Sequence, residues 1–262
     1  TGGTGVIGEA IVRNLAARPG SKVLFTGRRR ARGWRLQAAL HGCARFQAMD
    51  LGRASGTDIT GLLALADDVF EEPVGLVVNN AGVCLPGDGA HALERSLRVN
   101  AQMPTALAAA ALGVMAQRGA GRVVNVSSGD GELVYLRTDL QEAIRASTCL
   151  QELYAAAGRA ADSSRGPVAH GPAPAYSLSK AVLNRATVLL HDGIADGSGV
   201  GINAVCPGDV RSPMCALDPS APTTEPAEAA AAIVGAALAD GDTAFSDAPS
   251  GAFLRHGQVI LW

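Results

Sequence analysis

The chain has 262 residues, of which 48% are hydrophobic and 18% are charged, and its formal net charge at pH 7 is −2. A chain without long runs of one charge is a poor partner for nucleic acid or an anionic membrane, so neither is expected to bind. The most apolar tract, Met103 to Ala116, is shorter than the roughly 20 residues of a membrane span, which predicts a buried helix in a soluble protein.

Short apolar runs alternate with longer segments rich in Ala and Leu. The predicted strands are 22–26, 44–49, 75–78, 122–126, 201–205 and 259–261. The predicted helices lie near 9–17, 59–70, 90–117, 174–191 and 226–239. This alternation is typical of parallel strands joined by helical crossovers. We therefore expect an α/β fold, a doubly wound parallel sheet with helices on both faces, formed as one domain by residues 1–262.

One segment, 129–172, is longer than a connecting loop needs to be. Two groups of apolar residues in it recur at helical spacing. They are Leu133, Leu136, Leu140 and Ile144, followed by Leu150, Leu153, Tyr154 and Ala157. The segment is predicted to be a helical insertion packed on the domain surface, and a partner-binding arm is the alternative.

The five cysteines include no CxxC pair, and the five histidines share no ligand spacing. Neither a disulfide framework nor a metal site is expected from such scattered residues. Small buried thiols in a reducing compartment are the simpler interpretation, which predicts a cytoplasmic protein.

The chain opens on a glycine-rich turn that leads into an amphipathic helix. Glycines before a helix let a phosphate approach free N–H groups at the positive helix end, as in the first turn of a dinucleotide-binding fold. The residues expected to contact such a cofactor are Gly2, Thr4, Gly5, Val6, Ile7 and Gly8. The strand that normally precedes this turn is absent, so we expect a central strand to be missing and interpret the sequence as incomplete at its front.

The residues after the strand 22–26 bear on the choice between NAD and NADP. An acidic side chain there would bind the adenosine ribose of NAD, whereas an arginine can pair with the extra phosphate of NADP. Gly27 and Arg28 stand at this place, which favours NADP(H) with Arg28 as the phosphate ligand. The neighbouring Arg29, Arg30 and Arg32 are interpreted as a solvated basic face.

Five motifs along the chain occur together and in a characteristic order. They are TGGTGVIG at the start, NNAG after the strand 75–78, VNVSS, YSLSK, and a Pro-Gly turn after the strand 201–205. In these motifs the whole chain resembles the short-chain dehydrogenase/reductase family. The long segment 129–172 and the C-terminal region are similar to the carbonyl reductase branch of animals and to plant menthone and salutaridine reductases. In that branch the insert covers the face used by other members for dimerisation, which implies a monomer.

Tyr176 and Lys180 are four residues apart on a predicted helix, so their side chains share one face. A nearby ammonium favours the phenolate and would make Tyr176 a better proton-transfer group. The resemblance implies that Tyr176 protonates the substrate oxygen while the nicotinamide gives a hydride to carbon. It also implies that Ser128 binds the carbonyl oxygen, that Lys180 binds the nicotinamide ribose, and that Asn100 anchors a water in a proton relay.

The same resemblance implies further cofactor contacts. These are Asp50 and Leu51 near adenine, Asn79 and Ala81 after their strand, and Val210, Arg211 and Ser212 near the nicotinamide carboxamide. A helix cap is the alternative for Asp50. The substrate pocket is expected to be shaped by Cys84 to Gly89, Leu133 to Tyr135, Asp209 and Met214 to Leu217.

The leading hypothesis is an NADPH-dependent reductase of small ketones or aldehydes. The sequence departs from the family at Val6, where glycine is usual, and at Asp209, where carbonyl reductases often have an aromatic residue. These departures leave open a catalytically weak NADP(H)-binding scaffold or sensor. A sugar-nucleotide epimerase is disfavoured because the chain is too short for the usual substrate domain.

Overall fold

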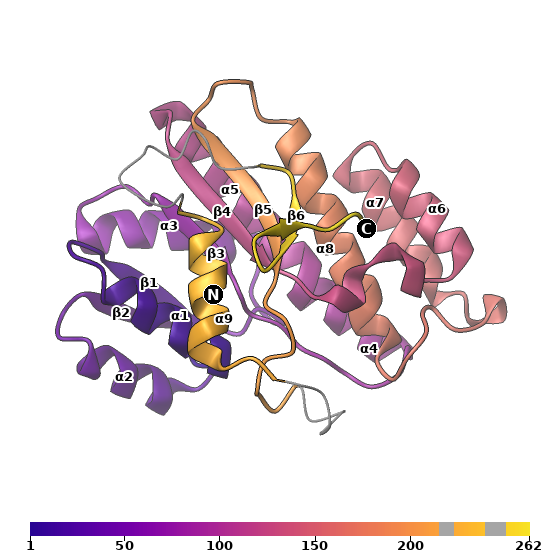
Figure 1. Cartoon of the computed structure of the whole chain (residues 1–262), viewed down its shortest axis with the longest axis horizontal. Coiled ribbons are helices and arrows are strands. Elements are labelled where there is room, and N and C mark those ends of the chain that lie inside the picture. The colour runs from indigo at the N-terminus through magenta and orange to yellow at the C-terminus, as the bar shows by residue number, and fades with distance from the viewer. Residues whose placement is uncertain (215–222, 239–249) are drawn as a thin grey trace.

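Two sheets lie at the centre of the computed structural model, which describes residues 1–214, 223–238 and 250–262 (Figure 1). The smaller sheet pairs β1 (Val23–Gly27) with β2 (Ala44–Ala48). The larger has the order β3-β4-β5-β6-β7, whose strands are Leu76–Asn79, Gly121–Val126, Val200–Cys206, Phe253–Arg255 and Gln258–Val259. All described pairs are parallel except β6–β7. The predicted parallel sheet is thereby confirmed, although β6 was missed and the last strand lies at 258–259.

The place between β1 and β3 separates the two sheets, because no strand among the described residues pairs with both of them. The first residues of the chain hydrogen-bond to both sheets. The amino group of Thr1 donates to the carbonyl of Val78 at 2.6 Å, and the Gly3 N–H donates to the carbonyl of Thr26 at 2.7 Å. The glycine turn lies at the carboxyl ends of β1 and β3, where doubly wound folds bind their ligands.

Helices cover both faces of the larger sheet. On one face, α1 (Val6–Ala16) packs beside α9 (Pro226–Gly235), and their apolar residues join those of β4 and β5. On the other face lie α5 (Met103–Arg118), its neighbour α3 (Gly56–Phe70) and α8 (Pro174–Asp192). Strands β4 and β5 are buried along their whole length, as continuous apolar strands covered on both faces should be.

Helix α3 and the unpredicted helix α2 depart from the sequence expectation for local reasons. Helix α3 begins three residues early because Ser55 and Asp58 form a capping box that starts the helix. Helix α2 (Arg30–Ala39) was not predicted, since only Gly33 and Leu36 of its arginine-rich sequence are buried and no apolar periodicity marks it. It packs against β1 and β2.

The predicted continuous helix 90–117 is interrupted. It consists of α4 (Ala90–Leu97), a π-helical turn from Arg98 to Gln102, and α5. The stretch Ala90–Arg118 is long and apolar enough to cross a membrane, but 56% of its apolar window is buried inside the fold, as the prediction of a buried helix requires. Single π-turns inside α-helices occur often at functional sites, and this one contains Asn100.

The segment 129–172 forms a helical insertion, as predicted. Its helices are α6 (Thr138–Ala146) and α7 (Leu150–Gly158), which lie beyond α8 on the right of Figure 1. Leu140, Ile144 and Leu153 are fully buried against α4 and α8. The apolar face of the insert is therefore used within the fold, which disfavours the alternative of a free partner-binding arm.

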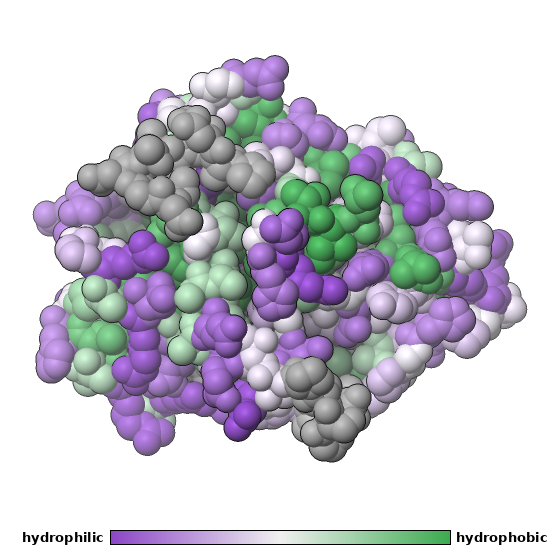
Figure 2. All heavy atoms as spheres, viewed as in Figure 1, coloured by the Kyte–Doolittle hydropathy of each residue, from purple (hydrophilic) through white to green (hydrophobic). Residues whose placement is uncertain are grey.

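The face shown in Figure 2 is mostly hydrophilic, with an apolar patch over β6 and the C-terminal end of the chain. The exposed apolar side chains of this region are Val259 and Leu261, whereas Phe253 of β6 lies in the core. The last strand therefore ends the sheet as an antiparallel, partly apolar edge.

Candidate active site

Four predicted catalytic residues lie at the carboxyl ends of the central strands. Ser128 follows β4, and Tyr176 and Lys180 lie in the first two turns of α8. Pro174 begins that helix at a position where proline is favoured, so the two side chains are presented close to its start. Asn100 reaches the same place from the π-turn.

Lys180 is 4% exposed and lies between β4 and Tyr176. Its Nζ donates to the carbonyl of Val126 at 2.8 Å and stands 5.6 Å from the centre of the Tyr176 ring. Burial lowers the pKa of Lys180 to about 8. The ammonium therefore loses its proton far more readily than an exposed lysine does.

Tyr176 is also buried, and burial is the main cause that raises the pKa of its phenol. A hydrogen bond with the Ser128 hydroxyl acts in the opposite direction but does not offset burial. Lys180 Nζ lies beside the Tyr176 ring but is bonded to the Val126 carbonyl, so its predicted support of the phenolate stays a prediction.

Ser128 caps a short 3-10 turn that follows β4. Its hydroxyl oxygen accepts from the Asp130 N–H at 3.3 Å. Burial, and then the charge of Asp209, raise the pKa of the Asp130 carboxyl, while the Ser128 hydroxyl and Arg255 lower it. Asp130 is thus a titratable group beside Ser128 that the sequence reasoning missed, although a serine two residues before an aspartate is a capping pattern.

Asn100 connects three parts of the site. Its Oδ1 accepts from the Val83 N–H at 2.8 Å, and its Nδ2 donates to the Val83 carbonyl at 2.8 Å and to Ser179 Oγ at 2.9 Å. A methyl group added at Gly82 would lie 3.5 Å from Asn100 Oδ1 and 3.8 Å from Lys180 Nζ. The Asn100 side chain therefore holds the segment after β3 against α8. The predicted role of Asn100 in a water relay stays a prediction.

The glycine turn fits a bound pyrophosphate. Gly2 has a φ of 69°, and a Cβ added at Gly8 would overlap the Gly2 carbonyl oxygen, so both positions require glycine. Gly5 is exposed at the N-cap of α1, and no side chain caps this helix. The positive end of α1 is thus open to an anion. Val6 is the first residue of the helix and needs no special backbone, so its departure from glycine leaves the turn intact.

The asparagines after β3 have different roles from those expected. The Asn79 side chain is 2% exposed and donates to the Pro104 carbonyl at 3.0 Å and to Asn125 Oδ1 at 2.9 Å. The side chain therefore lies in the core, because β3 directs it there, while the predicted contact of the Asn79 backbone with the cofactor stays a prediction. Asn80 instead donates to the carbonyl oxygens of Thr1 and Gly2, at 3.1 and 3.4 Å, and stabilises the glycine turn.

The structure gives a reason for the missing acidic residue after β1. A Cβ added at Gly27 would overlap the Thr4 hydroxyl, so no aspartate or glutamate side chain fits there. Arg28 follows directly and is exposed at the carboxyl end of β1. Arg28, which is predicted to bind the extra phosphate of NADP, is therefore accessible from solvent.

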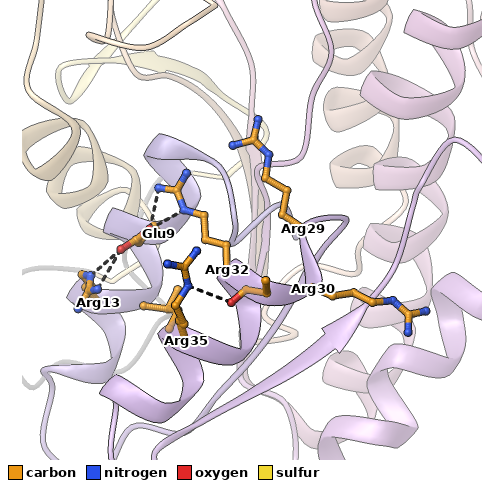
Figure 3. A pocket seen from close by; sticks show the side chains of 8 residues that line it. Glu9, Arg13, Arg29, Arg30, Arg32 and Arg35 are labelled. Atoms are coloured by element: carbon orange, nitrogen blue, oxygen red, sulfur yellow. Dashed lines mark hydrogen bonds and ion pairs between the residues drawn. The ribbon is translucent and has the colours of Figure 1, made fainter.

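The other arginines line a cavity of about 730 Å³ between α1 and α2 (Figure 3). We call it the arginine pocket; it is lined by Glu9, Arg13, Arg29, Arg30, Ala31, Arg32, Arg35 and Leu36. Glu9 accepts from Arg13 at 2.9 Å and from Arg32 at 2.7 Å. The interpretation of Arg32 as a solvated group is wrong, because this half-buried guanidinium is paired with Glu9.

The remaining predicted cofactor contacts are spread around the site. Asp50 Oδ1 accepts from the Gly52 N–H at 3.0 Å in a local turn, close to the alternative of a cap. Leu51 is buried in the core, and the Ala81 N–H donates to Thr1 Oγ1 at 3.1 Å.

The predicted contacts after the Pro-Gly turn differ in exposure. Val210 is buried and forms a β-bridge to Thr224. Arg211 pairs with Glu225 at 3.2 Å, and Ser212 is half-buried. Met214 is exposed, and residues 215–217 of the expected pocket lie outside the described residues.

Comparison with known proteins identifies the family. Residues 1–138, just over half of the chain, match the model of the short chain dehydrogenase family. Carbonyl reductase (NADPH) 3 of Mus musculus is 30% identical over 280 residues, which cover 100% of this chain and 96% of the mouse protein.

Two solved structures share the fold. Salutaridine reductase from Papaver somniferum superposes with a TM-score of 0.79 at 22% identity, over 96% of this chain and 97% of the other. The NADPH-bound carbonyl reductase from chicken fatty liver gives 0.71 at 22% identity, over 100% and 96%. The motifs, the geometry around Tyr176 and the matched family together lead to one conclusion: this chain belongs to the short-chain dehydrogenase family and is an oxidoreductase.

Proposed function

We propose that the protein is an NADPH-dependent carbonyl reductase that converts a small ketone or aldehyde into an alcohol. The observation that carries the proposal is the buried Tyr176 side chain, placed 5.6 Å from Lys180 Nζ on α8 and beside Ser128 at the end of β4. The similarity to mouse carbonyl reductase (NADPH) 3 supports the same cofactor and reaction class. The open N-terminus of α1 and the glycines of the turn suit the cofactor's pyrophosphate.

In this mechanism Tyr176 gives its phenolic proton to the carbonyl oxygen of the substrate. A nicotinamide cofactor held at this edge of the sheet would supply the hydride that the carbonyl carbon needs. The Ser128 hydroxyl donates a hydrogen bond to the same oxygen as negative charge develops there. The Lys180 ammonium beside the Tyr176 ring stabilises the phenolate that remains, and Asn100 keeps the segment after β3 in place.

The first experiment is a titration with NADPH and separately with NADH, followed by nicotinamide fluorescence. Arg28→Ala is expected to weaken NADPH binding by about 10- to 100-fold and leave NADH binding unchanged, because a charge-assisted bond to the extra phosphate is lost. Arg32→Ala removes the same charge from a guanidinium already paired with Glu9, and serves as the matched control. Equal binding of both cofactors by the unaltered protein would contradict the NADP(H) assignment.

Turnover then separates a reductase from a scaffold or sensor. NADPH oxidation is followed at 340 nm with a panel of aromatic and aliphatic aldehydes and ketones. A reductase oxidises NADPH with at least one of them, whereas a scaffold binds the cofactor and turns over none. The placement of Ser128, Tyr176 and Lys180 together at the carboxyl end of β4 favours the reductase.

We also propose a monomer in the cytoplasm. The insert covers the outer side of α4 and α8 with buried leucines, so this face is not available to a second copy. Sedimentation velocity at micromolar protein should give a single species of one-chain mass. A concentration-dependent dimer would contradict the assignment. The variant Leu140→Asp, which disturbs the buried face of the insert, is compared with the parent in the same experiment.

A further inference from the structure

The turn that follows β4 is bonded to α8 on both sides of Ser128. Before Ser128, the Ser127 hydroxyl donates to Asn184 Oδ1 at 2.5 Å. After it, Asn184 Nδ2 donates to the Gly131 carbonyl at 3.2 Å. Ser127 and Asn184 are 3% and 1% exposed, so both bonds form away from water, where hydrogen bonds are most directional.

Asn184 lies one helical turn after Lys180 on the same face of α8. The backbone of Gly131 packs directly on Lys180, since an added Cβ would come within 2.8 Å of the Lys180 carbonyl carbon and Cβ. Lys180 itself bonds to the Val126 carbonyl. The turn after β4 is thus held on α8 by Ser127, which precedes Ser128, and by Gly131, which follows it.

We propose that Ser127 and Asn184 are positioning residues for the reaction: their buried hydrogen bonds set the distance of the Ser128 hydroxyl from Tyr176. This rests on the proposed reductase function, in which Ser128 and Tyr176 bind the same carbonyl oxygen. Neither positioning residue touches that oxygen. They act through the turn that carries Ser128, and an error of about 1 Å in such a site can lower the rate by about 100-fold.

The same strand and helix offer a matched control. Asn125 Nδ2 donates to Thr187 Oγ1 at 2.9 Å, and both residues are buried. This pair also joins β4 to α8, but it lies before the turn and does not bracket Ser128. Thr187→Val removes one buried hydrogen bond between the same two elements with little change of volume.

The test compares Ser127→Ala, Asn184→Ala, their double variant and Thr187→Val. NADPH oxidation with 4-nitrobenzaldehyde gives kcat and KM, and nicotinamide fluorescence gives the Kd of NADPH. Ser127→Ala and Asn184→Ala are expected to lower kcat by about 10- to 100-fold with the Kd of NADPH within about threefold of the parent. The double variant should be no slower than the slower single variant, because the two residues act as one unit. Thr187→Val should change kcat by less than about threefold.

Crystal structures of the parent and of Ser127→Ala, the milder change, provide the second measurement. The Ser128 Oγ to Tyr176 Oη separation is expected to change by about 0.5 Å or more. An unchanged separation, or a kcat loss no larger than that of Thr187→Val, overturns the positioning role. If the parent reduces no carbonyl compound, the proposed function fails, and the separation in the crystals still decides the positioning role.

Discussion

Replacing Tyr176 with phenylalanine is expected to lower kcat for carbonyl reduction by about 10²- to 10⁴-fold, the range for loss of a general acid. In the proposed reaction the phenol gives the proton, and phenylalanine fills the same buried space without the hydroxyl. NADPH binding should stay within about threefold, because the ring and Lys180 remain in place. Single-turnover measurements at saturating NADPH would locate the loss in the chemical step.

Tyr154→Phe is the matched control, since it removes a buried phenolic hydroxyl from α7 of the insert and leaves the site untouched. Its kcat should equal that of the parent. If Tyr176→Phe kept more than about a tenth of the parent kcat, general acid catalysis by this residue would be excluded.

Lys180→Met is expected to abolish measurable turnover and at the same time to stabilise the protein. Burial lowers the pKa of Lys180 from 10.5 to about 8, which corresponds to about 3 kcal/mol of unfolding free energy lost at neutral pH. Methionine removes that penalty together with the bond to the Val126 carbonyl, which contributes about 1 kcal/mol. The net expectation is a gain of about 2 kcal/mol in the free energy of unfolding at pH 7, measured by urea denaturation.

The sign of the pH dependence follows from the same shift. Since the pKa of Lys180 is lower in the folded than in the unfolded protein, the penalty is complete below about pH 8. Between pH 8 and 10.5 the unfolded state binds more protons, so the free energy of unfolding gains a contribution that rises with pH. Lys180→Met should lack this rise.

Lys22 is the other lysine of the chain and supplies the control. It is exposed and pairs with Glu72 at 2.8 Å, so Lys22→Met should change the free energy of unfolding by less than about 1 kcal/mol. With two lysines, ¹³C NMR of the ε-carbons yields both titrations in one experiment. A Lys180 signal that does not titrate near pH 8 would contradict the buried assignment.

Much of this architecture could be predicted from the sequence, because local patterns determine it. The strands 122–126 and 201–205 are continuous apolar runs, and burial on both faces accounts for them. The helical spacing of Leu140 and Ile144 predicted helix α6 of the insert. Tyr176 and Lys180 share a helix face, so their proximity also follows from local periodicity.

Features that depend on tertiary contacts could not be predicted in this way. The π-turn at Asn100 changes which backbone groups are paired without changing the apolar pattern. Strand β6 is three residues long and forms only because β5 is its neighbour. The bond between Ser127 and Asn184 joins residues 57 positions apart, and no local spacing indicates it.

The roles of Asn79 and Asn80 were within reach of sequence reasoning. Side chains alternate between the faces of a strand, so consecutive asparagines at a strand end point to opposite sides. Asn79 is the last residue of β3 and faces the core, while Asn80 lies beyond the strand and reaches the glycine turn. The resemblance alone did not separate the two positions.

Strands β1 and β2 have a small core of their own, in which Phe25 and Phe46 lie 5.4 Å apart, and this bears on how the protein opens. Ser128 follows β4, and Tyr176 and Lys180 lie on α8, outside this core. Helix α1 contributes Val12 to the small core and Ile11 to the core around β4 and β5, so it connects the two.

Regions with few buried apolar contacts open at lower free energy, and the core of β1 and β2 has fewer buried residues than the cores around β4 and β5. Amide hydrogen exchange should therefore be faster in β1 and β2 than in β4 and β5. Opening of β1 and β2 moves Arg28 away from a bound cofactor, while the surroundings of Tyr176 stay folded. A cofactor that contacts both β1 and the surroundings of Tyr176 slows exchange in β1 and β2 by its own binding free energy. Selectivity for a cofactor and proton transfer therefore depend on different regions of the protein.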